Sequence, residues 1–148
     1  MAVNTLPLSF GKVTTTTAAI TVAKTAETDI SSPADATDLR LLFTAGTNGG
    51  GIDTIEYQVV TTSGSPTQAA SKINIWETDT SGANARIVRQ VIVAAGSAIS
   101  TTVAGQNGII TFNRADMASG TKVFVTVTVV TTNCQWNFTC RGGQFESQ

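Results

Sequence analysis

The chain has 148 residues, of which 13% are charged, and its nine basic and ten acidic side chains give a formal net charge of -1. It contains no histidine, which excludes Ser-His-Asp and Cys-His catalytic sites and most zinc sites. No basic run offers a footprint for nucleic acid, and no stretch approaches the ~18 consecutive apolar residues that a membrane span needs. We therefore expect one domain that is not an enzyme, needs no cofactor or metal, and binds neither nucleic acid nor membrane.

The composition favours an all-β fold. Threonine occurs 26 times, valine 14 times and isoleucine 11 times, whereas leucine occurs only five times. β-Branched side chains lose rotamer freedom in helices and pack well on a pleated sheet.

The first half of the chain predicts an extended segment followed by short strands. Residues 1–26 are rich in Thr and Ala, and we interpret them as either an N-terminal arm or the first strand, with a strand at 13–22. A single β-sandwich domain is expected over 27–148. Its first strands are predicted at 39–43 and 52–60.

The second half continues with strands at intervals of about ten residues. Asn107-Gly108 predicts the type I′ turn of a tight hairpin, residues 113–120 a helical turn, and residues 141–145 a tail. Further strands are predicted at 73–77, 86–93, 99–103, 109–112, 122–132 and 134–140. Eight to ten short strands predict an antiparallel β-sandwich, with a jelly roll as the leading topology and a partly closed barrel as the alternative.

Alternation along these strands predicts which side chains form the core. On a strand, Cys134 and Cys140 share a face with Trp136 and Phe138, and six steps separate the two cysteines by about 20 Å, too far for a disulfide. We expect two free buried thiols, the alternative being a tight loop closed by a disulfide. The other expected core residues are Leu41, Phe43, Ile55, Tyr57, Val59, Val125 and Val127.

Three polar or aromatic features have structural and functional interpretations. Asp79 begins an Asp-Thr-Ser-Gly turn, which favours a capped hairpin over a calcium loop. The glycines after Asn48 have no following helix or Lys-Ser/Thr, so they indicate a wide turn, or a place where a neighbouring chain's backbone approaches. Trp76, Tyr57 and Trp136 could stack on sugars, because Trp76 lies opposite the apolar face of its strand.

Leu6, Leu8 and Phe10 alternate near the start of the chain and would share one face of a strand. They indicate either the first strand of the sandwich or an arm that crosses to another subunit or to a capsid surface.

Residues 39–55, which read LRLLFTAGTNGGGIDTI, resemble a pattern in small structural proteins of tailed bacteriophages and prophages. In those proteins a strand ends in an LFTAGxNGG loop and the chain re-enters with IDxI. The segment from Gly142 to Phe145 is similar to their short Gly-Gly-x-aromatic ends. The resemblance is firm over residues 38–60 and looser to 145, and this chain has Gly51 where such loops often continue with arginine.

The resemblance implies a virion component, most like a capsid decoration (cement) protein on the outer surface of the phage head. Its expected partners are the major capsid protein and further copies of the chain in a trimer. The alternatives are a neck, tail or head-fibre component, or a carbohydrate-binding adhesion module. The predicted subunit or capsid interface comprises Leu6, Leu8, Phe10, Asn48, Gly49, Gly50 and Phe145.

Overall fold

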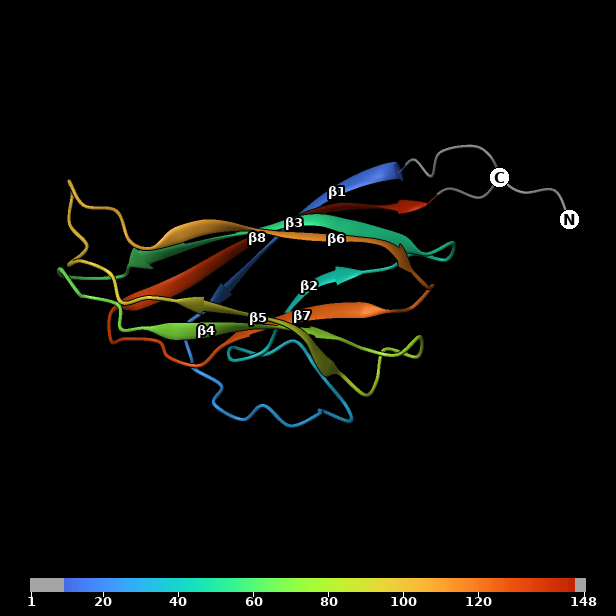
Figure 1. The fold of residues 1–148 in the computed structure, drawn as a ribbon, viewed down its shortest axis with the longest axis horizontal. Coiled ribbons are helices and arrows are strands. Elements are labelled where there is room, and N and C mark those ends of the chain that lie inside the picture. Colours follow the sequence, from blue (N-terminus) through green and yellow to red (C-terminus); the bar gives the residue numbers. More distant parts are fainter. Residues whose placement is uncertain (1–9, 146–148) are drawn as a thin grey trace, which may run out of the picture.

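The computed structural model describes residues 10–145, which form eight β-strands and no helix (Figure 1). Within this part of the chain there is accordingly no helix that could cross a membrane. The strands are β1 (Phe10–Ile20), β2 (Arg40–Thr44), β3 (Gly50–Thr61), β4 (Ser71–Glu77), β5 (Arg86–Val93), β6 (Asn107–Met117), β7 (Lys122–Val127) and β8 (Cys134–Phe145).

The strands form two four-stranded antiparallel sheets, in the orders β1-β8-β3-β6 and β2-β7-β4-β5. The pairs β1·β8, β2·β7, β3·β6 and β4·β5 are those of one long antiparallel hairpin that has been wrapped into two layers. Wrapping a hairpin in this way produces a jelly roll. The strand order therefore confirms the predicted jelly-roll sandwich.

Two predicted features around residue 105 are wrong. Residues 99–103 form a turn instead of a strand, because the Ser100 hydroxyl accepts hydrogen bonds from the backbone N–H groups of Thr102 and Val103, both at 3.2 Å. Asn107 and Gly108 do not form a hairpin turn. They begin β6 and pair with Gln58 and Tyr57 of β3.

The helical turn predicted at 113–120 and the tail predicted at 141–145 are also strands. β6 runs on to Met117 through Asn113, whose φ of 49° lies in the left-handed region that asparagine tolerates, and its register with β3 is irregular nearby. β8 runs on to Phe145 because it lies between β1 and β3, which both pair with its last residues. Long-range pairing, which no local pattern reveals, extends both strands.

Most of the predicted core residues are buried between the two sheets. They are Phe43, Ile55, Val59, Val125 and Val127. Leu41 and Tyr57 are instead half-buried. A β-bulge between Leu41 and Phe43 breaks the alternation of β2, so Leu42 and Phe43 both enter the main core while Leu41 packs in a second cluster.

That second cluster corrects the expectation that Trp76 is exposed. Trp76 does lie on the face opposite Ile73 and Ile75, but it is fully buried there with Leu39 and Phe124. Its indole Nε1 donates to the Thr126 hydroxyl at 3.0 Å. The segment between β1 and β2 runs along this face of the sheet (Figure 1), and its Ile30 and Leu39 belong to the same hydrophobic cluster as the ring.

The segment from Cys134 to Cys140 is part of β8, as predicted, and both cysteines are free and buried. Burial raises the pKa of the Cys140 thiol to about 12 and raises that of Cys134. Both groups therefore stay protonated at neutral pH, and a protonated thiol is a poor nucleophile.

We expect titration of the native protein with a thiol reagent at pH 8 to give almost no reaction, and titration after denaturation to give two thiols. Failure to find two thiols in denatured, non-reduced protein would contradict the free-thiol assignment.

Candidate functional site

The described residues of the predicted interface come together at one end of the sheet β1-β8-β3-β6. Phe10 and Phe145 are register partners in β1 and β8. The backbone N–H of Phe145 donates to the carbonyl of Gly49 at 3.3 Å, and Asn48 Nδ2 donates to the carbonyl of Phe145 at 3.5 Å. Gly50 pairs with both β6 and β8 in the same place. We call this cluster of Phe10, Asn48, Gly49, Gly50 and Phe145 the terminal end.

Leu6 and Leu8 lie outside the described residues. Phe10 begins β1, so the part of the N-terminal segment from this residue to Ile20 is a strand of the sandwich. The first described residue pairs with the last one, so both ends of the described chain lie at the terminal end (Figure 1).

The two glycines of the terminal end are required by the chain's own backbone. Gly49 has a φ of 87°, and a Cβ there would lie 2.5 Å from the carbonyl oxygen of Met117. A Cβ on Gly50 would lie 2.7 Å from the carbonyl oxygen of Gly143. The predicted close approach of a backbone is therefore present, but within the described residues the backbone belongs to the same chain. Asn48 remains exposed beside these glycines and is available to a partner.

Side chains cover the free edge of β2 beside the terminal end. Thr16 donates its hydroxyl to the carbonyl of Leu42, and Gln144 Nε2 donates to the carbonyl of Thr44 at 3.2 Å. The carboxylate of Asp35 accepts the backbone N–H of Leu41 at 2.9 Å. Covering an edge in this way prevents another strand from pairing with it. Sequence analysis missed Gln144, which stood in the quoted Gly-Gly-Gln-Phe motif but was assigned to a tail.

On the side of the sandwich away from β2, an ion pair links the two sheets. Arg114 of β6 donates Nη2 and Nε to the two carboxylate oxygens of Glu77 on β4, at 2.7 and 3.1 Å. Glu77 is buried, and its hydrogen bonds raise the pKa of the Arg114 guanidinium. Such a two-point contact fixes the spacing of β6 and β4 at this end.

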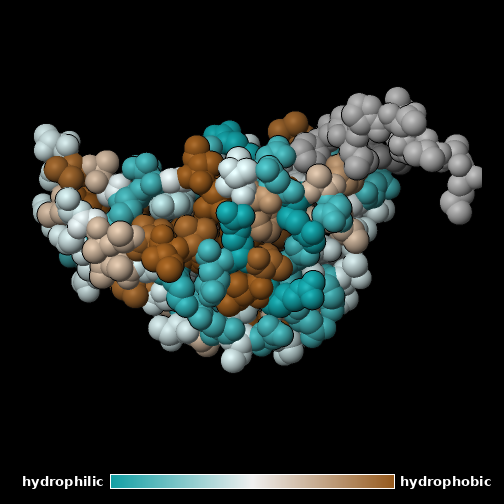
Figure 2. Space-filling view, in the orientation of Figure 1, coloured by the Kyte–Doolittle hydropathy of each residue, from teal (hydrophilic) through white to brown (hydrophobic). Residues whose placement is uncertain are grey.

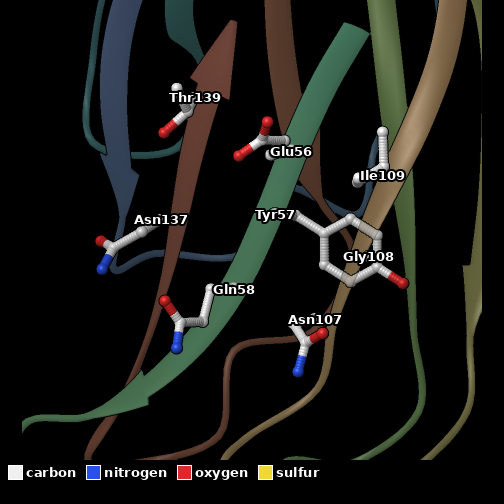
Figure 3. Close-up of a pocket in the computed structure, with 8 residues that line it drawn as sticks. All are labelled: Glu56, Tyr57, Gln58, Asn107, Gly108, Ile109, Asn137 and Thr139. Atoms are coloured by element: carbon white, nitrogen blue, oxygen red, sulfur yellow. The ribbon is translucent and has the colours of Figure 1, made fainter.

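The outer face of the sheet β1-β8-β3-β6 has a shallow hollow of about 370 Å³ (Figure 3). Gln58, Asn107 and Asn137 surround it with amide groups, and the Tyr57 ring lies beside Gly108. The sugar-stacking interpretation needed exposed rings, whereas Trp76 and Trp136 are both fully buried. Two of its three aromatic residues are thus unavailable to a ligand.

Asp79 forms the predicted capped turn. Its carboxylate accepts hydrogen bonds from the N–H and hydroxyl of Ser81, the N–H of Ala83 and the amide of Asn84. The Ser81 hydroxyl contributes most to lowering the pKa of Asp79 from 3.8 to about 2. Among residues 10–145 there is no group of three or more acidic or cysteine side chains that could hold a metal ion.

The lowered pKa predicts a pH dependence of stability. Because the folded-state pKa of Asp79 lies below its unfolded value, its stabilising effect is full above pH 4 and is lost as the pH falls through about 2. We expect Asp79→Asn to melt below the unmodified protein at pH 6, with the difference narrowing towards pH 2. A difference in melting temperature that stays constant over this range would contradict the assignment. Ser81→Ala should give the same trend with smaller amplitude.

No family model matches the chain, and no curated protein matches it. Among solved structures it is similar to the VP2 subviral particle of infectious bursal disease virus, with a TM-score of 0.32 and 14% identity over 91% of this chain and 34% of that one. It is also similar to a structure of the Gt strain of the same virus, with a TM-score of 0.27 and 19% identity over 90% of this chain and 32% of that one. The chain spans about a third of the length of these solved chains. This is a weak structural similarity to viral particle proteins, and the fold assignment is based on the strand order.

Proposed function

We propose that the protein is a non-enzymatic structural component of a virion, and specifically a decoration (cement) protein on the outer surface of a phage head. It binds the major capsid protein at the joints between capsid subunits and stabilises their contacts. It does so as a trimer, because such joints lie on threefold or quasi-threefold axes.

The observation that carries this proposal is the convergence at the terminal end. Four segments that are far apart in the sequence meet there, and they include the two motifs that resemble tailed-phage structural proteins. The exposed Asn48 gives this end a polar side chain that can contact a partner. The composition is consistent with the same role, because its many Thr, Asn and Gln side chains provide a hydrated polar surface with few charges.

Binding through such an end depends little on salt. Residues 1–11 contain no charged side chain, so contacts made by Leu6, Leu8 and Phe10 are apolar. Burial of each large apolar side chain contributes about 1.5–3 kcal/mol, and this contribution is not screened by ions.

Quantitative mass spectrometry of purified particles tests the proposal. A decoration protein is present in hundreds of copies per particle and is cleaved by external protease while the head remains closed. A dozen copies or fewer would contradict the decoration role and support a neck or tail component. Complete absence from particles, together with binding to a glycan array, would support the adhesion module instead.

A further inference from the structure

The sandwich is open along the side where β5 and β6 lie. β5 pairs only with β4 and β6 pairs only with β3, so each has a free edge. Between them is a hollow of about 320 Å³. We call it the β5–β6 seam, and its lining residues are Glu77, Arg86, Val88, Arg89, Phe112 and Arg114.

Apolar side chains are exposed at this side of the molecule. Val88 on β5, which lines the seam, is 40% exposed. Ile92 on β5 and Ile109 on β6 are 81% and 68% exposed and lie on the outer faces of these two edge strands. Val91 and Phe112 are only partly buried against the main core. Figure 2, in the orientation of Figure 1, shows hydrophobic side chains in the middle of the visible face, where β5 and β6 lie. Free strand edges beside exposed apolar side chains are the features of a surface that accepts an added strand.

The seam has a defined length. At one end the Glu77–Arg114 ion pair joins the two sheets, and at the other end Gln106 Nε2 donates to the carbonyls of Gln68 and Ala94. The seven residues of β5 from Ile87 to Val93 lie between Arg86, which pairs with Glu77, and Ala94, which accepts from Gln106. They span about 23 Å.

We propose that residues 1–9 of a second copy of this chain occupy the β5–β6 seam, adding a strand to the free edge of β5. This proposal deepens the trimeric decoration role and depends on it for its biological setting. The segment carries no charge, and Leu6 and Leu8 alternate, so that on a strand both side chains can face the apolar Val88 and Phe112 of the seam. Nine residues reach about 30 Å, which is enough to fill the seam and to leave two residues as a link.

Pro7 fits this arrangement. Successive residues of a strand direct their backbone N–H and C=O groups to opposite sides, so Leu6 and Leu8 can pair with β5 while Pro7, which has no N–H, faces away. The segment can therefore be an outer strand but not a central one.

The origin of the segment favours a second copy over the same chain. β1 starts at the terminal end and runs into the domain beside β8, on the other side of the sheet from β6. Residues 1–9 would have to reverse direction directly before Phe10 to follow β5 of their own chain. Donation from one copy to the next, repeated head to tail, closes a ring when the rotation allows it. A trimer is such a ring.

Two of the three other sheet edges, those of β2 and β6, are less suitable acceptors. The free edge of β2 is covered by Thr16, Asp35 and Gln144. The free edge of β6 is disrupted by Asn113 and by register shifts, which twist a strand away from pairing.

Intermolecular paramagnetic relaxation tests the proposal in the full chain. A nitroxide is attached to Thr5→Cys protein, where it reacts only with the introduced cysteine because both native thiols are buried. This protein is mixed with 15N-labelled protein that has no spin label. We expect selective broadening of the amides of Arg86–Val93 and of Phe112 in the 15N-labelled copies. A nitroxide on Ser65→Cys, in an exposed loop at the other end, is the control and should leave these amides sharp.

When the spin-labelled chain also carries Leu6→Asp and Leu8→Asp, we expect the broadening to disappear. Alone, this variant should sediment as a monomer and keep the amide spectrum of a folded protein. Absence of broadening for the unsubstituted arm, or broadening centred on β1, would overturn the proposal. Because only purified protein is used, this result is independent of binding to particles. If residues 1–9 occupy the seam but the protein is absent from virions, only the decoration role is refuted.

Discussion

Trp76→Ala should lower the free energy of unfolding by about 3–5 kcal/mol. The side chain is fully buried with Leu39, Ala85 and Phe124, and truncation leaves a cavity between the sheet and the segment that covers it. It also leaves the Thr126 hydroxyl without its partner in a buried position. Equilibrium denaturation with urea, followed by circular dichroism, measures the loss.

Trp76→Phe separates packing from hydrogen bonding at this site. It keeps an aromatic ring in the cluster but removes the donor to Thr126, so we expect a smaller loss of about 1–3 kcal/mol. Equal losses for the two variants would contradict the packing explanation. A loss below about 1 kcal/mol for Trp76→Ala would mean that the segment between β1 and β2 does not cover the ring in solution.

Gly142→Ala is the second large effect, because β8 runs between two strands at this residue. Gly142 pairs with Thr14 of β1 and Ile52 of β3, and a Cβ there would lie 2.2 Å from the carbonyl oxygen of Gly51. A backbone atom in a central strand cannot move aside without breaking the ladder. We expect a loss of about 3 kcal/mol or more, measured by urea denaturation.

Gly64→Ala is the matched control for this variant. Gly64 has a φ of 67°, but a Cβ there meets no atom within 4 Å. Only left-handed backbone strain is added, which costs about 1–2 kcal/mol. If Gly142→Ala is no worse than Gly64→Ala, the close approach of β8 to β3 is wrong.

Local sequence patterns predicted which face of each strand points into the sandwich better than they predicted where the strands end. Alternation in Ile52–Val60 and in Cys134–Cys140 identified the correct inward faces, because both strands lie in a two-layer sandwich. The extension of β6 to Met117 and of β8 to Phe145 depends on partners far away in the sequence. The β-branched side chains at 99 and 101–103 have high β propensity, but hydrogen bonding of Ser100 to nearby N–H groups turns the chain there.

The same distinction applies to burial and to the candidate site. The face on which Trp76 lies follows from alternation, whereas its burial depends on a covering segment that the pattern of β4 does not reveal. Asn48 and Phe145 were selected from separate motifs, and only the pairing of β3 and β8 brings them together. The β5–β6 seam had no sequence signal, because it results from the absence of strand pairing between two edges.

The central claim is that attachment of this jelly roll to a particle requires the segment that precedes β1, because this segment joins the copies of the trimer that binds there. The most direct test is co-sedimentation of purified full-length protein and of a variant lacking residues 1–9 with capsids that lack the protein. All eight strands and both hydrophobic clusters lie within residues 10–145, so the deletion should leave the melting temperature nearly unchanged. We predict that the full-length protein sediments with capsids in both 50 mM and 500 mM salt, whereas the folded variant stays in the supernatant. Equal binding of the two proteins, or unfolding of the variant, would contradict the claim.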